Sequence, residues 1–274
     1  MEKIKEALKK AKSQTNVSEN KVSQVKNKSA TNDLLKNDIS ESSIIYEQTK
    51  IIKLDAQTLE NNRIVAVNKH SPASWAFDSL RTQVLQKMEE NGWSTLAIVS
   101  PTPEAGKSVI AINLAISIAH KPNKTVMLVD FDLRKPRIAK YLGIKCKKSI
   151  NDFISGDAEL KDIIVNPGIP KLTILPTNNS VARSAETLSS SKIQDLVSEL
   201  KDRYSSRIII FDLPPLLNVD DAMVLLPQVD CVLFVVGDGQ HSETEIIESM
   251  RLLSRSNILG VVVNRAEVEE RNYY

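Results

Sequence analysis

The stretch LAIVSPTPEAGKSVIAINLA, residues 96–115, decides the fold expected for this chain. Its first four residues are apolar and predict a buried strand, and residues 109–115 continue as an apolar helix. Between them lies the tripeptide Gly106-Lys107-Ser108. A glycine lets backbone amides turn inward, a lysine reaches phosphate oxygens, and a serine hydroxyl can bind magnesium. The stretch therefore predicts a phosphate-binding loop between a strand and a helix.

This loop departs from the usual glycine-framed pattern, because its first position is Pro101. The strand before it and the helix after it still supply the context that the motif requires. We expect the loop to bind ATP with Mg²⁺. The expected nucleotide-binding residues in the loop are Glu104, Ala105, Gly106, Lys107, Ser108 and Val109.

Five further apolar runs have the length and composition of strands: residues 125–130, 172–176, 207–212, 231–236 and 258–264. Segments with helical periodicity accompany them, at residues 72–90, 109–120, 192–204 and 242–254. Continuously apolar strands that alternate with helices indicate a parallel sheet covered on both faces. The predicted fold class is α/β, a three-layer α/β/α P-loop NTPase domain with a mostly parallel sheet.

Acidic residues stand at the ends of two of these strands. The second strand ends in Asp130-Phe-Asp132-Leu-Arg134, and the fourth ends in Asp212. Carboxyl ends of parallel strands meet at one edge of a sheet, where ligands bind. We therefore expect Asp130 and Asp132 to face the magnesium and the γ-phosphate. Asp212 occupies the usual place of a magnesium-linked carboxylate.

The chain is predicted to divide into two parts. Residues 1–60 are expected to form a short amphipathic helix and a disordered linker, since residues 15–42 are rich in Ser, Asn, Lys and Thr. A solvated, frayed terminus explains the first residues equally well. Residues 61–274 are expected to form the ATP-binding domain with a short tail.

Composition excludes several other classes of protein. A net charge of +2 and 4% aromatic residues do not favour nucleic-acid binding. Cys146, Cys231 and the three histidines have no metal-ligand spacing, and a buried thiol is the simplest interpretation of Cys231. No apolar run approaches the roughly 20 residues that span a bilayer. These features favour a cytoplasmic location, with membrane contact only through a partner or the N-terminal helix.

Taken together, the loop, the Asp130–Arg134 segment and the run Ile-Phe-Asp212-Leu-Pro-Pro resemble the bacterial tyrosine kinases of polysaccharide synthesis and export, over roughly residues 60–274. The segment with the pattern DxDxR is the most specific part. The resemblance implies that Lys107 contacts the phosphates and that Ser108, Asp132 and Asp212 organise magnesium. It also implies that Asp130 accepts the tyrosine proton and that Arg134 stabilises transferred charge.

Other positions follow from the same resemblance. Asn264 and Arg265 come after the last strand, where related folds contact adenine, although an ordinary strand cap is nearly as good an explanation. Tyr273 and Tyr274 match a minimal C-terminal tyrosine cluster, which in the family is phosphorylated in trans by a neighbouring subunit.

The predicted assembly follows the family less closely. The helix that joins subunits in the family carries Glu-x-x-Arg-x-x-Arg, and the corresponding residues here are Trp75, Asp78 and Arg81. A homo-oligomer built on that ion-pair pattern is therefore doubtful. Trp75 and Phe77 could instead be apolar anchors of an interface, or simply part of the core. The expected activator is a membrane chain-length determinant of the Wzz-like type, which would recruit the chain to the inner face of the plasma membrane.

Three functions remain open from sequence. The first is a protein-tyrosine autokinase that regulates capsule or exopolysaccharide assembly. The second is a positioning ATPase of the ParA or MinD type, although the signature lysine of that class is replaced by Thr102. The third is a nucleotide-switched scaffold without kinase activity.

Overall fold

The fold is built on a parallel sheet. The computed structural model of the chain describes residues 51–202 and 207–266. Within these residues six strands form one sheet in the order β3-β2-β4-β1-β5-β6, and all paired neighbours run parallel. The strands are β1 (Thr95–Val99), β2 (Thr125–Asp130), β3 (Leu172–Leu175), β4 (Arg207–Asp212), β5 (Cys231–Gly237) and β6 (Ile258–Asn264).

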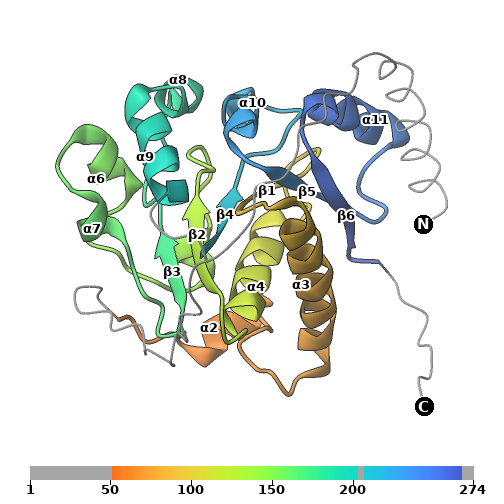
Figure 1. The fold of residues 1–274 in the computed structure, drawn as a ribbon, viewed down its shortest axis with the longest axis horizontal. Coiled ribbons are helices and arrows are strands. Elements are labelled where there is room, and N and C mark those ends of the chain that lie inside the picture. The colour runs from red at the N-terminus through yellow and green to blue at the C-terminus, as the bar shows by residue number, and fades with distance from the viewer. Residues whose placement is uncertain (1–50, 203–206, 267–274) are drawn as a thin grey trace, which may run out of the picture.

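Helices cover both faces of this sheet (Figure 1). They are α2 (Ala56–Asn61), α3 (Pro72–Asn91), α4 (Lys107–Ala119), α5 (Ile138–Tyr141), α6 (Ile150–Ser155), α7 (Leu160–Ile163), α8 (Ser184–Leu188), α9 (Ser191–Asp202), α10 (Asp221–Leu225) and α11 (Glu243–Leu252). Two short 3₁₀ turns, Leu226–Gln228 and Leu253–Arg255, follow α10 and α11.

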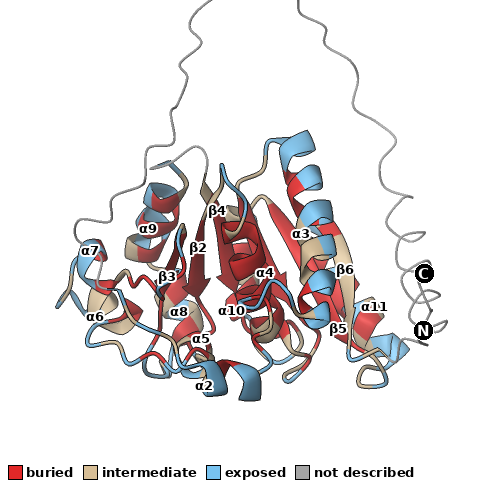
Figure 2. Cartoon of the chain, turned by 90° about the horizontal axis from the view of Figure 1, so that it is seen from below, coloured by how far each residue is buried: buried red, intermediate tan, exposed pale blue. Residues whose placement is uncertain are grey.

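The core consists of two apolar layers, one on each face of the sheet. Side chains of α3 and α4 pack on one face, and those of α8, α9, α10 and α11 pack on the other. Figure 2 shows the consequence: buried residues concentrate on the strands and on α4, while the outer faces of α3 and α9 are exposed. The predicted three-layer α/β/α fold with a parallel sheet is thus confirmed.

The predicted strands lie within one residue of the observed ones, since each is a short apolar run between polar residues. Cys231 opens β5 and is fully buried, and burial raises the pKa of its thiol to about 12. It is therefore an unreactive core residue, as expected. None of the described helices is both long enough and apolar enough to cross a membrane.

Some predictions concern residues outside the described ranges. They are the N-terminal amphipathic helix, the linker up to residue 50, and the terminal Tyr273 and Tyr274.

Strand order brings the acidic strand ends together. β4 lies between β1 and β2, so the strand that leads into the phosphate loop is next to the strand that ends in Asp212. Asp130 and Asp212 are direct partners in the register of β2 and β4. Adjacent strands lie about 4.8 Å apart, so the backbone alone places these two carboxylates side by side.

Candidate active site

The phosphate loop between β1 and α4 depends on a single glycine. Gly106 has a φ of 90°, and a Cβ atom there would lie 2.2 Å from Asn264 Nδ2. Any other residue at this position would therefore clash as well as strain the backbone. Glu104 also adopts a left-handed conformation, with a φ of 68°. α4 begins at Lys107, so the amide groups of its first turn are directed towards the loop.

Lys107 is the central charge of the site. Its Nζ lies 2.9 Å from Asp132 Oδ2 and 3.2 Å from Asp212 Oδ1, and its side chain is 9% exposed. Burial by itself favours a neutral amine, but the attraction of Asp212 and Asp132 outweighs it and raises the pKa of Lys107 above its ordinary value. The positive charge of Lys107 therefore partly neutralises the negative charges of the two carboxylates beneath the loop.

Asp130 is fully buried beside Asp212. Its Oδ2 accepts hydrogen bonds from the backbone amides of Arg137 and Ile138, each at 3.0 Å, and so fixes the start of α5. Its Oδ1 is buried and has no hydrogen-bond partner among the described residues. Burial, together with the neighbouring charge of Asp212, raises the pKa of Asp130 well above its ordinary value. Asp130 thus holds a proton more readily than an exposed carboxylate does.

A pocket of about 400 Å³ opens over Lys107 and Asp132. Most of its lining residues come from the phosphate loop, the segment after β2 and the segment after β4. They are Pro103, Glu104, Gly106, Lys107, Ser108, Val109, Asp132, Arg134, Lys135, Arg137, Tyr141, Pro214, Pro215, Asn218, Val219 and Arg265. Asp130 and Asp212 are not among them.

The donor groups beneath this pocket fit a magnesium nucleotide. Asp212 Oδ2 is buried without a hydrogen-bond partner in the described part of the chain, and it can serve as a metal ligand or as a water acceptor. Ser108 and Asp132 add a hydroxyl and a carboxylate. Within residues 51–202 and 207–266, no three His, Cys, Asp or Glu side chains are arranged to hold a metal ion by themselves. Phosphate oxygens and water would have to complete the coordination, which is how magnesium usually binds beside nucleotides.

The convergence of Asp130, Asp132 and Asp212 on one metal stays a prediction. Two backbone amides occupy Asp130 Oδ2, so only its Oδ1 is available for such a role.

Arg134 has a partner that the sequence did not reveal. Its Nε and Nη2 both lie 3.1 Å from Oδ1 of Asp221, a fully buried residue at the start of α10. This ion pair holds the guanidinium of Arg134, whose side chain is 42% exposed, at the wall of the pocket. In the sequence Asp221 resembles an ordinary helix-start acid, and only its burial distinguishes it.

Asn264 and Arg265 contact the phosphate loop. Asn264 Nδ2 donates to the carbonyl oxygen of Ala105 and Arg265 Nη2 to that of Glu104, each at 2.8 Å. Both predicted nucleotide contacts after β6 are thus next to the site, and Arg265 also lines the pocket.

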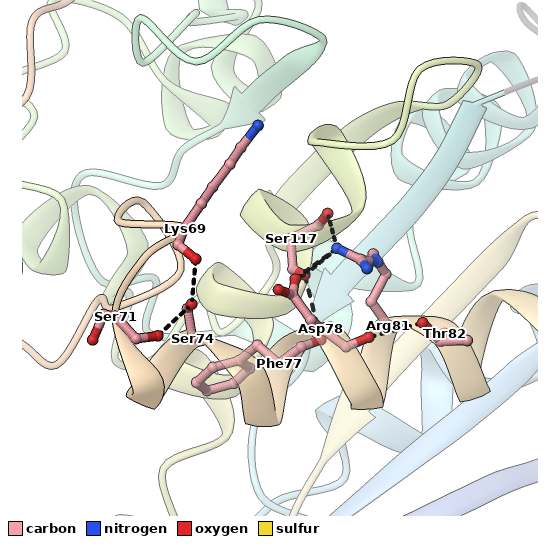
Figure 3. A network of polar contacts seen from close by, with 8 residues as sticks. All are labelled: Lys69, Ser71, Ser74, Phe77, Asp78, Arg81, Thr82 and Ser117. Atoms are coloured by element: carbon pink, nitrogen blue, oxygen red, sulfur yellow. Dashed lines mark hydrogen bonds and ion pairs between the residues drawn. The ribbon is translucent and has the colours of Figure 1, made fainter.

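The α3 segment that holds Trp75, Asp78 and Arg81 forms an internal network, shown in Figure 3. Arg81 Nη1 donates to Asp78 Oδ1 at 2.6 Å and to Ser117 Oγ of α4 at 3.1 Å, and Ser117 Oγ donates to Asp78 Oδ1 at 2.7 Å. Phe77 packs against the core, whereas Trp75 is 64% exposed. The ion pair with Asp78 therefore keeps Arg81 in contact with α4 of the same chain.

The chain is similar in sequence to known proteins. Residues 95–254, more than half of the chain, match the AAA domain family. The putative tyrosine-protein kinase EpsB of Ralstonia nicotianae is 29% identical over 204 residues, which are 74% of this chain and 27% of EpsB. The chain thus spans only about a quarter of the length of that relative.

Two solved structures are also similar. The kinase domain of the Escherichia coli tyrosine kinase ETK has a TM-score of 0.66 and 27% identity, and the match covers 77% of this chain and 84% of that one. The septum site-determining protein MinD of Pyrococcus horikoshii, complexed with Mg-ADP, has a TM-score of 0.55 and 24% identity over 65% of this chain and 72% of that one, which shows the shared fold alone. The chain belongs to the AAA domain family, and it is similar in sequence and fold to bacterial tyrosine kinases.

Proposed function

We propose that this chain is an ATP-dependent protein-tyrosine kinase that acts in exopolysaccharide or capsule synthesis. The observation that carries the proposal is the position of Lys107 between Asp132 and Asp212, beneath a phosphate loop and at the floor of an open pocket. The kinase names of EpsB and of the ETK domain support the same activity.

Nucleotide binding would change the partners of Lys107. The triphosphate brings negative charge to the pocket, so the Lys107 amine would turn from the carboxylates to the β- and γ-phosphates. Asp132 and Asp212 would then be available, with Ser108, to hold magnesium. When bound, magnesium neutralises charge on the phosphate oxygens of the transferring group.

Transfer to tyrosine needs a group that orients the incoming hydroxyl and takes its proton. We assign this role to Asp130, because its Oδ1 has no partner among the described residues and its pKa is raised. Arg134, held at the pocket wall by Asp221, would stabilise the charge on the transferred phosphoryl group. Positioning and charge neutralisation of this kind account for most of the catalysis in phosphoryl transfer.

The acceptors and partners belong to the same proposal. Tyr273 and Tyr274 would be phosphorylated in trans by another copy of the chain, and a membrane chain-length determinant would act as the activator. Residues 1–50 would connect the chain to this partner, since Ala56–Asn61 forms α2 and Leu59 is buried in the core. A cytoplasmic chain held at the membrane by its partner would bring these tyrosines close to neighbouring sites.

A positioning ATPase is the alternative that the fold comparison keeps open, since MinD has the same fold. Thr102 in place of the signature lysine argues against it. The two functions differ in their product, which is phosphotyrosine for the kinase and free phosphate for the ATPase.

The test uses the full chain with ATP and Mg²⁺, with and without the cytoplasmic tail of a candidate membrane partner, and maps phosphotyrosine by mass spectrometry. We expect modification of Tyr273 or Tyr274 in the parent protein and none in Lys107→Met or Asp130→Asn. Lys124→Met, which removes a partly exposed ion pair with Glu89 outside the pocket, serves as the matched control.

Asp130→Asn should still bind ATP, which separates loss of transfer from loss of binding. Phosphate release without phosphotyrosine would favour the positioning ATPase, and ATP binding without turnover would favour the scaffold. Unchanged phosphotyrosine in Asp130→Asn would remove that residue as the proton acceptor.

A further inference from the structure

Three consecutive carbonyl groups of the phosphate loop each accept a hydrogen bond from a side chain of the β5–β6 end of the sheet. The donors are one residue of the loop after β5 and two residues at the end of β6. The bonds are Gln240 Nε2 to Pro103 O at 2.9 Å, Arg265 Nη2 to Glu104 O at 2.8 Å and Asn264 Nδ2 to Ala105 O at 2.8 Å.

These contacts determine where the amide groups of the loop point. In a trans peptide the C=O and the N–H of the next residue lie on opposite sides of the peptide plane. The chain has no cis peptide bond among its described residues. Carbonyls that are held towards β5 and β6 therefore turn the N–H groups of residues 104–106 away from these strands, to the side that binds phosphate.

The loop needs such support because its own sequence does not supply it. Gly106 is the only glycine between residues 100 and 108, and Glu104 must adopt a left-handed φ of 68°. A residue other than glycine pays roughly 1–2 kcal/mol for this conformation. Arg265, the residue that holds the Glu104 carbonyl, is itself in the left-handed region with a φ of 60°. Strained residues in direct contact are typical of functional sites.

The side chain of Gln240 packs closely against Gly237 and Arg265. A Cβ atom at Gly237 would lie 2.5 Å from Gln240 Oε1, so the glycine at the end of β5 makes room for the glutamine side chain. The same Oε1 lies 3.5 Å from Arg265 Nη1, a long contact that joins two of the three donors. The glutamine thus contacts the loop through its amide nitrogen and Arg265 through its amide oxygen.

We propose that Gln240, Asn264 and Arg265 form a carbonyl clamp that orients the loop amides towards the phosphates of the nucleotide. This inference rests on the proposed function, in which the loop binds ATP. Gln240 is a positioning residue, since it acts through the loop backbone and is not among the residues that line the pocket.

The experiment measures the affinity of the full chain for MgATP and for inorganic tripolyphosphate, each by competition with a fluorescent ADP analogue. The variants are Gln240→Ala and Gln240→Glu, of which the second keeps the size of the side chain but removes the N–H donor. Gln86→Ala, on the exposed face of α3, is the matched control. The urea midpoint without nucleotide reports on any general loss of stability.

We expect both Gln240 variants to bind MgATP and tripolyphosphate about fivefold to tenfold more weakly than the parent, the effect of one lost hydrogen bond. The urea midpoint should remain close to that of the parent. Equal losses for the two ligands would place the effect at the phosphates, since tripolyphosphate has no base.

Affinities within twofold of the parent would overturn the clamp, and so would a loss for MgATP that spares tripolyphosphate. If the parent itself did not bind MgATP, that result would refute the proposed function, and the clamp proposal, which depends on it, would be refuted too.

Discussion

Replacing Lys107 with methionine should destabilise the protein even when no nucleotide is present. Methionine is close to lysine in length, so packing changes little. What is lost is the counter-charge of Asp132 and Asp212, which lie 2.9 Å and 3.2 Å from the amine. At an effective dielectric constant of about 20, each attraction is worth roughly 5 kcal/mol before the cost of burying the charges is subtracted.

The net effect is smaller, because burying a lysine is costly. Breaking a buried ion pair by removing one partner typically costs about 3–5 kcal/mol, and we expect a loss in this range near pH 7.5. Without the lysine, the pKa of buried Asp212 should rise further, so that the folded protein holds a proton that the unfolded chain releases. Stability then falls as pH increases above the ordinary value of 3.8, and the penalty should shrink towards acid pH.

Urea unfolding of the parent and of Lys107→Met at about pH 4.5 and pH 7.5 measures this difference. Lys124→Met removes a partly exposed ion pair with Glu89 and should cost less than about 1 kcal/mol at both pH values. A Lys107→Met protein as stable as the parent at pH 7.5, or one whose penalty did not depend on pH, would refute the charge balance described for this site.

Three further predictions concern other acidic residues. Burial raises the pKa of Asp130, so the parent loses stability as pH rises and this carboxyl must ionise. Asp130→Asn, which does not ionise, should therefore become more stable than the parent between about pH 4 and pH 7, as measured by urea midpoints. Asp78→Ala should cost about 1–3 kcal/mol, because Arg81 loses its carboxylate partner and keeps only the oxygens of Ser117, while its Nε is already buried without a partner among the described residues. Calorimetry measures this loss, and light scattering shows whether subunits associate. Burial acts to raise the pKa of Asp230, but hydrogen bonds such as that from the Ser94 amide outweigh it and lower the pKa. Asp230→Asn should therefore lose about 1–3 kcal/mol of stability at pH 7 and less as pH falls through the acid range, as measured by urea unfolding at several pH values.

The sequence was sufficient to predict the sheet and the position of the site. Each strand is a short apolar run, and the run that precedes Gly106 identifies the phosphate loop. The α/β alternation then places Asp132 and Asp212 at the same edge of the sheet, because parallel strands align their carboxyl ends. These features are local patterns, or they follow directly from strand order.

Other parts of the site could not be predicted because they depend on contacts between distant residues. Gln240 lies 137 positions from the carbonyl oxygen it binds, in a loop of ordinary polar composition. Asp221 resembles a solvent-exposed helix start until its burial and its pairing with Arg134 are seen. The engagement of Asp130 by backbone amides depends on how the chain turns after β2, which side-chain periodicity does not encode.

The register of β2 and β4 has a consequence for any redesign of this protein. Asp130 and Asp212 are neighbours because two hydrogen-bonded strands end at the same level, so their separation is a property of the main chain. Repacking the surrounding core cannot move the two acids apart while that ladder remains intact. Their mutual repulsion can be relieved only by a positive group or by a proton. A variant that supplies neither must replace one of the two aspartates with a neutral residue.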